Sequence, residues 1–468
     1  MHHRVLGGAL AALLLLTACS GGQAAPAPPP ADSVSGVGDP LFPLAGNGGY
    51  DVSHYGLVLD YEPATGLLRG TAKITARATR QLPAFNLDLS GLTVGTVTVD
   101  GAAAKTSRAG TELTVRPAHA VARGAAFIAT VEYSGVPSII KDDDGSHEGW
   151  IRTDDGAVAL GEPVGSMTWF PGNNHPSDKA AYDIAVTVPA GLTAVSNGEL
   201  TATRTSGGRS TFQWHSAEPM ASYLTTVAIG HFQVTQSHTA SGLPVYVAVD
   251  PREAGEDRSG VLRKIPEILD WESALFGPYP FSSTGAIVDR VDREVVGYAL
   301  ENQTKPVFPG DTEGTTLDEP TLVHELAHQW FGDSVTPRTW QGMWLNEGFA
   351  TYTEWLWDEQ HGGDSVQKHF DTAYADDAQW EFPPADPGSA ENVSDAPVYG
   401  RGAMVLHKVR QAVGDKDFFT ILRTWAVEHR HGNVNTAEFT AWCEKHSGKN
   451  LSGLFAAWLY GDGRPKTP

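Results

Sequence analysis

The sequence predicts a multidomain chain, with an N-terminal antiparallel β-sandwich followed by an α+β domain. Its 468 residues exceed what one hydrophobic core usually serves. From about residue 50 to residue 234, short runs alternate apolar and polar residues between Gly, Pro, Asn and Asp, as the strands of an antiparallel sandwich do. Beyond them, strand patterns mix with helical ones. We expect a β-domain over residues 43–235 and a second domain over residues 236–468.

The first 18 residues are predicted to be an export signal. Two histidines and Arg4 form a positive start, and the apolar run over residues 5–16 is too short for a stable membrane anchor. The run ends in Leu16-Thr17-Ala18-Cys19, which resembles a bacterial lipobox. The resemblance implies cleavage before Cys19 and a lipid on its sulfur. The alternative is a plain secretory signal with an incidental cysteine.

The segment after the signal is expected to be a flexible tether over residues 19–42, because it is rich in Ala, Pro, Gly and Ser. The protein is thus expected at the outer face of a bacterial membrane, or in the medium if the lipobox is not used. Cys443 is the only other cysteine and is expected to be a buried apolar residue, so the mature chain can form no internal disulfide.

The charge balance excludes some partners. Lys and Arg number 33 against 55 Asp and Glu, a net charge of −22. This argues against nucleic acid as a partner and against docking on anionic lipid by a basic patch.

Each domain has its own run of predicted elements. In the first domain, alternating strand patterns lie at 55–63, 70–80, 92–101, 125–135, 182–191 and 210–216. In the second, strands are expected at 244–249 and 285–290, a helix at 261–275 with Pro266 near its start, and helices at 402–414, 415–429, 436–448 and 451–461.

A metal-binding pattern occupies the centre of the second domain. His324 and His328 stand four residues apart with Glu325 between them, so on a helix both imidazoles share one face and can bind one ion. An acidic start at 318–320 and Gly332 as a stop favour that helix. The bare pattern could also occur by chance on an ordinary amphipathic helix.

A third ligand makes the metal site more specific. Eighteen residues separate His328 from Glu347, which lies at the start of a second predicted helix over residues 344–360. Two histidines and one carboxylate leave one position of tetrahedral Zn²⁺ open for water, as in a catalytic site. We expect one zinc ion per chain.

These segments resemble the aminopeptidase N family of zinc peptidases, of the gluzincin type. HELAHQWFG and WLNEGFATY match its zinc segments, and the stretches at 49–55, 169–171, 219–224 and 276–281 match structural ones. The resemblance implies a thermolysin-like zinc peptidase domain with His324, His328 and Glu347 as ligands and Glu325 as the base. It covers nearly all of the mature chain, without the large helical C-terminal domain common in that family.

The resemblance also implies residues that bind the substrate's amino group. Tyr298-Ala299-Leu300-Glu301-Asn302 sits where the family carries Gly-x-Met-Glu-Asn, so Glu301 takes the role of holding the α-ammonium. Tyr298 and Leu300 depart from the motif, which affects pocket shape. Glu162, eight residues before Phe170, has the spacing of a second amine-binding residue. A strand glutamate facing solvent is the alternative for Glu301.

One further catalytic residue follows from the resemblance. Tyr399-Gly400-Arg401-Gly402 resembles the family's Tyr-x-Lys-Gly segment, which implies that Tyr399 donates a hydroxyl to the oxyanion. A buried structural tyrosine is the alternative. His175, His361 and His407 have no partner at ligand spacing and are expected to be surface or packing residues.

The predicted function is that of a zinc aminopeptidase acting on peptides with a free N-terminus outside the cytoplasm. A zinc endopeptidase using the same helix pair is the nearest alternative, and Glu301 distinguishes the two. A non-catalytic, lipid-anchored peptide-binding protein is a third possibility. The sequence predicts neither the oligomeric state nor the preferred first residue.

Overall fold

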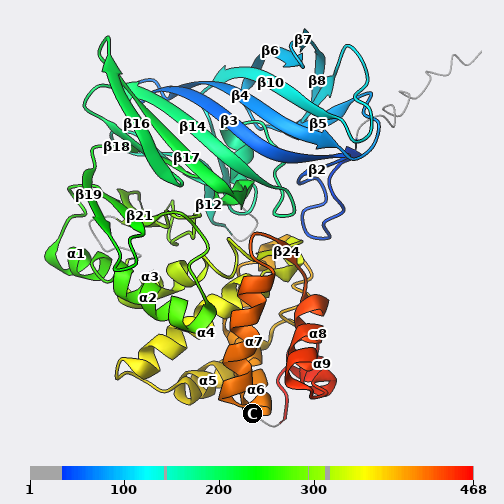
Figure 1. Ribbon diagram of the computed structural model, residues 1–468, viewed down its shortest axis with the longest axis vertical. Coiled ribbons are helices and arrows are strands. Elements are labelled where there is room, and N and C mark those ends of the chain that lie inside the picture. The colour runs from blue at the N-terminus through cyan, green and yellow to red at the C-terminus, as the bar shows by residue number, and fades with distance from the viewer. Residues whose placement is uncertain (1–33, 142–144, 293–294, 311–316, 467–468) are drawn as a thin grey trace, which may run out of the picture. The chain divides into compact units, whose positions relative to one another are not determined.

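The computed structural model describes residues 34–141, 145–292, 295–310 and 317–466, which form a β-rich domain followed by a largely helical one (Figure 1). The predicted signal peptide, Cys19 and the start of the predicted tether lie outside the described residues. None of the helices in these ranges is long and apolar enough to cross a bilayer.

The first domain is built on one large sheet of eight strands. Its order is β16-β17-β14-β3-β4-β10-β6-β7. The strands are β3 (Tyr50–Glu62), β4 (Leu67–Ala78), β6 (Thr93–Val99), β7 (Ala102–Ala103), β10 (Ala126–Gly135), β14 (Lys179–Pro189), β16 (Glu199–Ser206) and β17 (Arg209–Ala221). All neighbours are antiparallel except β3 and β14, which are parallel, so the predicted antiparallel sheet contains one parallel pair.

Two smaller sheets complete this domain. One has the order β11-β12-β13-β18-β15 and the other β5-β9-β8. Their strands are β5 (Phe85–Asp88), β8 (Lys105–Ala109), β9 (Glu112–Arg116), β11 (Ile139–Lys141), β12 (His147–Arg152), β13 (Ala157–Leu160), β15 (Thr193–Ser196) and β18 (Val227–Gly230).

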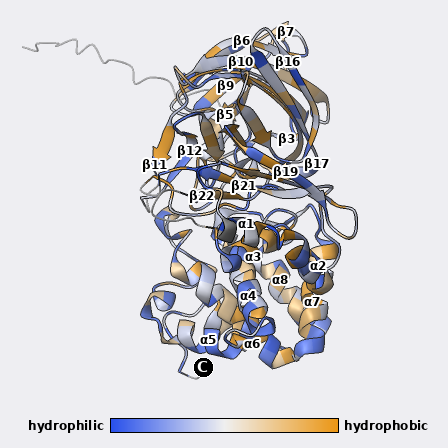
Figure 2. Ribbon diagram, turned by 90° about the vertical axis from the view of Figure 1, so that its left-hand side faces the viewer, coloured by the Kyte–Doolittle hydropathy of each residue, from blue (hydrophilic) through white to orange (hydrophobic). Residues whose placement is uncertain are grey.

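The predicted period of two is visible in the burial of the large sheet. Along β4, buried and less buried side chains alternate from Leu67 to Ala78, and Figure 2 shows hydrophobic and hydrophilic residues interleaved on the strands. The buried face packs against aromatic side chains of the five-stranded sheet. Tyr61 of β3 meets Trp150 of β12 edge to face, with ring centroids 5.1 Å apart. The predicted β-rich first domain is therefore confirmed.

The last part of the predicted flexible tether is packed against the domains. Residues 34–48 contain a two-stranded sheet of β1 (Val34–Ser35) and β2 (Asn47–Gly48). Asp39 is 2% exposed and accepts a hydrogen bond from the backbone amide of Trp340 in the second domain. A flexible tether over the whole of 19–42 is therefore wrong for residues 34–42, because buried hydrogen bonds fix them.

The second domain starts with a four-stranded sheet in the order β19-β20-β21-β22. Its strands are β19 (Gln233–His238), β20 (Pro244–Val249), β21 (Thr284–Arg290) and β22 (Val307–Gly310), and a pair β23 (Thr336–Pro337) and β24 (Asn433–Val434) lies further on. The sheet is parallel except for β19–β20. Because β19 already belongs to it, the predicted boundary after residue 235 falls inside a strand.

The helices fill the rest of the second domain. They are α1 (Glu256–Leu262), α2 (Ile265–Phe276), α3 (Glu319–Ala327), α4 (Trp344–Gln360), α5 (Val366–Ala375), α6 (Gly402–Val413), α7 (Asp415–Glu428), α8 (Thr436–Ser447) and α9 (Ser452–Trp458). The single helix predicted at 261–275 is instead two, α1 and α2. Pro266 is the reason, since proline lacks an amide hydrogen and suits the first turn of a new helix.

Candidate active site

The two histidines and Glu347 meet as their spacing predicts. His324 and His328 lie one turn apart at the end of α3, and Glu347 lies in the first turn of α4. The Nε2 atoms of His324 and His328 are 3.1 Å and 3.4 Å from the same Oε2 of Glu347. Side-chain ligand atoms of the three residues all lie within 4.8 Å of one another.

Local sequence fixes the start of α3 and the turn that follows it. The side chain of Asp318 accepts a hydrogen bond from the amide of Thr321, and Pro320 lies in the first turn. The chain then turns at Gly332, whose φ is +126°. A Cβ there would lie 2.0 Å from Oδ1 of Asn346, so only glycine lets this turn touch α4. The contact keeps the two ligand-bearing helices together.

The Nδ1 atoms of both histidines, which face away from Glu347, each have a hydrogen-bond partner. Nδ1 of His324 lies 2.5 Å from Oε1 of Glu354, and Nδ1 of His328 lies 3.1 Å from the carbonyl of Phe331. Each of these oxygens accepts a hydrogen bond from Nδ1–H, so each Nε2 is left with its lone pair facing Glu347. This donor set, two Nε2 atoms and one carboxylate, fits Zn²⁺.

The charge of the surroundings also fits a cation. Among the described residues lining the cavity, carboxylates occur at 162, 301, 325, 347 and 354, while Lys141 is the one lysine or arginine. Burial raises the pKa of Glu325 to about 8, and Glu301 and Glu347 add to this while the histidines oppose it. A divalent cation would offset this excess of negative charge. The residues present therefore fit the zinc that the sequence predicts.

Glu301 and Glu162 lie beside the three metal-binding residues. Carboxylate oxygens of Glu162, Glu301 and Glu347 lie within 4.8 Å of one another. Burial, with the nearby Glu301 and Glu347, raises the pKa of Glu162 well above its usual range. Its Oε2 is buried and has no hydrogen-bond partner among the described residues. Both side chains can be ionised in this position only beside a cationic partner.

Different parts of the fold hold these two carboxylates. Glu301 is 3% exposed, its Oε1 accepts a hydrogen bond of 3.0 Å from Asn346, and its backbone carbonyl accepts one from Gln329. Glu162 follows β13 in the first domain. The backbone amides of Val164 and Gly165, just beyond it, both donate to the buried carboxylate of Glu148.

Hydrogen bonds also join the segment around Glu301 to the first domain. Nδ2 of Asn197 donates to the carbonyl of Gln303 at 2.8 Å, and Nζ of Lys305 donates to the carbonyl of Gly198 at 2.9 Å. The hydroxyl of Tyr298 donates to the carbonyl of His147 at 2.9 Å. Tyr298, the departure from the family motif, thus serves as a contact between the domains.

Tyr399 reaches the site from a π-helical turn, η6 (Pro397–Arg401), just before α6. Its ring stacks on His324 with centroids 6.1 Å apart. A close approach of two helices makes this possible, because a Cβ on Gly348 of α4 would lie 2.8 Å from the backbone of Gly402. The guanidinium of Arg401 is buried and donates to the carbonyls of Trp458 and Phe382, which holds the turn.

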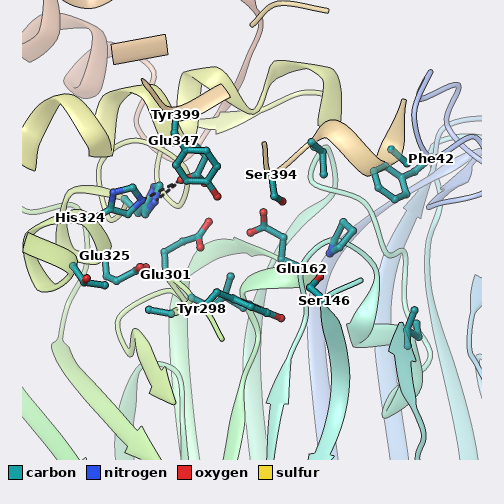
Figure 3. Close-up of a pocket in the computed structure, with 18 of the residues that line it drawn as sticks. Phe42, Ser146, Glu162, Tyr298, Glu301, His324, Glu325, Glu347, Ser394 and Tyr399 are labelled. Atoms are coloured by element: carbon teal, nitrogen blue, oxygen red, sulfur yellow. Dashed lines mark hydrogen bonds and ion pairs between the residues drawn. The ribbon is translucent and has the colours of Figure 1, made fainter. Parts of the chain in front are cut away.

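All the predicted site residues of the described chain line one cavity of about 590 Å³. In Figure 3, His324, Glu347 and Tyr399 lie at one end, Phe42 lies at the other, and Glu301 and Glu162 lie between them. Burial raises the pKa of Tyr399 well above its usual range, so its hydroxyl stays a donor. The predicted site residue Cys19 lies outside the described residues.

Some site residues were missed by the sequence reasoning. Glu354 stands seven residues after Glu347, two turns along the same face of α4, which is the one signal that could have revealed it. Phe42 carries no motif. His175, His361 and His407 lie away from the cavity lining and pack as expected, His175 against Asp39.

Comparisons with known proteins show similarity to one family in both domains. The Peptidase M1 N-terminal domain matches residues 51–224, and the Peptidase family M1 domain matches residues 312–458. Aminopeptidase M1 of Arabidopsis thaliana is 26% identical over 326 residues, which are 66% of this chain and 37% of the relative. The chain thus spans well under half the length of that relative.

Solved structures match over a larger share of both this chain and the matched protein. An M1 zinc metallopeptidase from Deinococcus radiodurans has a TM-score of 0.83 and 28% identity, covering 93% of this chain and 98% of its own. A mutant of that enzyme bound to a Tyr-Ser-Ala substrate has the same TM-score and identity, covering 93% of this chain and 99% of its own. The chain belongs to the M1 family of zinc metallopeptidases, and its described residues share the fold of these structures.

Proposed function

We propose that the protein is a zinc aminopeptidase that removes the first residue of peptides with a free N-terminus. The observation that carries this proposal is the pair of carboxylates, Glu162 and Glu301, beside the zinc-binding residues. A free α-ammonium placed between them loses its water and gains two negative partners. With the amino group held there, the peptide bond placed at the metal end of the cavity is the first one.

The residues of the chain divide the reaction between them. His324, His328 and Glu347 hold Zn²⁺, which when bound supplies a water acidic enough to act at neutral pH. Glu325 accepts the proton of the attacking water and passes it to the leaving amine. The hydroxyl of Tyr399 donates to the oxygen on which negative charge develops. Glu162 and Glu301 fix the distance from the amino group to the bond that breaks.

The alternative is a zinc endopeptidase, and matched peptides distinguish the two. We expect the protein to cleave a short peptide with a free amino group and to leave its N-acetylated copy almost intact. The acetylated copy has the same sequence but no positive charge for Glu162 and Glu301 to bind. Equal cleavage of both copies, or cleavage at an internal bond, would replace the proposal with the endopeptidase.

The place of action is part of the proposal. The polar start, the apolar run and the lipobox-like Leu16-Thr17-Ala18-Cys19 support export and lipid attachment at Cys19, at the outer face of a bacterial membrane. The mature protein should then partition into detergent, and its N-terminal peptide should carry the mass of a lipid. A mass that matches an unmodified N-terminus would contradict the anchor and leave secretion as the alternative.

A further inference from the structure

The cavity extends beyond the residues that the proposed reaction uses. Phe42, Ser146 and Pro163 line it as well, and we call their end the distal compartment. Figure 3 places Phe42 at the end opposite His324 and Glu347, with Glu162 between.

The position of the amino group decides what can enter this compartment. In a peptide bound by its ammonium at Glu162 and Glu301, the chain beyond the first peptide bond leaves on the metal side. The side chain of the first residue is then free to point away from the metal, toward Phe42.

Phe42 is held firmly although it lies ahead of the first strand of the large sheet. Its backbone amide donates to Oδ1 of Asp39 at 3.0 Å, and its ring meets Trp340 edge to face, with centroids 5.7 Å apart. It is half-buried, so one side of the ring can face a ligand. Residue 42 also precedes residue 51, where the match to the M1 N-terminal domain begins.

Asp39 connects this segment to both domains. Its Oδ2 accepts a hydrogen bond of 2.8 Å from the amide of Trp340 and lies 3.1 Å from Nε2 of His175. Burial alone would raise the pKa of Asp39, but these partners and the amides of Leu41 and Phe42 outweigh it and lower the pKa. The charged carboxylate of Asp39, with hydrogen bonds to both of its oxygens, thus fixes the backbone that carries Phe42.

We propose that Phe42 contacts the side chain of the substrate's first residue and favours long apolar or aromatic ones, and that Asp39 is the positioning residue for this contact. The inference rests on the proposed aminopeptidase function. The ring of Phe42 offers an apolar surface to such side chains. Glu162, which lies next to the distal compartment, disfavours an acidic side chain there.

The test compares two aminoacyl-arylamides, one with phenylalanine and one with alanine as the first residue. Phe42→Ala should lower the ratio of kcat/KM for the phenylalanine substrate to that for the alanine substrate by about tenfold, because one ring contact is lost. Turnover of the alanine substrate should stay within about twofold, which reports a folded active site. Leu44→Ala is the matched control, since Leu44 is 62% exposed in the same segment and does not line the cavity.

Asp39→Asn separates positioning from mere structural support. It keeps the shape of the side chain but weakens the hydrogen bonds that hold Phe42, so the ratio should fall in the same direction with a smaller amplitude. An equal loss on both substrates would overturn the role of Asp39. An active wild type whose ratio is unchanged or raised by Phe42→Ala would overturn the inference alone. A wild type that cleaves neither arylamide would overturn the proposed function as well.

Discussion

Two neighbouring parts of the active-site cavity are built in different ways: the metal end, and the part with Glu162 and Glu301, which we call the amine end. At the metal end, His324, His328 and Glu347 come from two successive helices, and their distances follow from helix geometry and one loop. At the amine end, Glu162 comes from the first domain and Glu301 from the second, and bonds such as Asn197 to Gln303 hold the domains together. The metal end therefore depends on local structure, and the amine end depends on how the two domains pack.

The largest expected effect is at the metal end. His328→Ala removes a ligand and should abolish both stoichiometric zinc binding and peptide hydrolysis, measured by metal analysis and by arylamide cleavage. His361→Ala is the control, because His361 packs on Trp357 outside the cavity and should keep both properties. Full zinc content in His328→Ala would contradict the assigned ligand set.

The next largest effect is expected at the amine end, where a substitution should reduce activity without loss of zinc. Glu301→Gln should lower kcat/KM for peptides with a free amino group by about 10²–10⁴-fold, because a buried ammonium loses its charged partner. Zinc content should stay at the wild-type level, since Glu301 is not one of the three residues assigned to the metal. A loss of zinc that accompanies the loss of activity would show that the two ends are not separate.

A smaller effect is expected at Tyr399. Tyr399→Phe removes the hydroxyl but keeps the ring that stacks on His324, so kcat should fall by about 10²–10³-fold with little change in KM. Steady-state kinetics on one arylamide give both constants. If KM rises and kcat is kept, Tyr399 acts in substrate binding and not on the oxyanion.

A smaller effect on zinc binding is expected at Glu354, which lies on α4 and contacts the metal-binding residue His324. Glu354→Gln keeps a side-chain oxygen that can accept from His324 but removes its charge, so zinc affinity should weaken by about 10–100-fold. Competition with a chelator of known affinity measures this directly. Glu359→Gln on the same helix is the control, because its carboxylate bonds to the amide of Val366, away from the site. Equal affinities in the two variants would remove Glu354 from the metal end.

The smallest effect concerns the packing between the domains. Burial lowers the pKa of Lys305 from 10.5 to about 7, with Glu199 opposing this. Between these values the unfolded chain binds a proton that the folded protein does not, so the contribution of Lys305 to stability rises with pH. The free energy of unfolding of wild type relative to Lys305→Met should rise by about 1.4 kcal/mol per pH unit from about pH 8 to about pH 9.5. Denaturant unfolding of both proteins at both pH values measures this. The same difference in unfolding free energy at about pH 8 and about pH 9.5 would contradict the prediction.

The sequence by itself determined the parts of the protein whose geometry is local. The predicted helix at 344–360 coincides with α4, and the acidic start of α3 does cap the helix through Asp318. The i, i+4 spacing brings the two Nε2 atoms to one carboxylate because an α-helix has 3.6 residues per turn whatever surrounds it. Period-two alternation likewise predicted the β-rich first domain, since side chains of a strand point alternately to its two faces.

Only the tertiary structure decided the rest. The motifs at 298–302 and around Glu162 suggested a shared role, but the contact of Glu162 with Glu301 joins residues 139 positions apart, and the packing of two domains makes it. Phe42 lies in a segment whose composition predicts a flexible tether, and it reaches the cavity because buried Asp39 bonds to Trp340, about 300 residues away. Such contacts depend on the packing of complete domains, whereas periodicity and capping depend on neighbours along the chain.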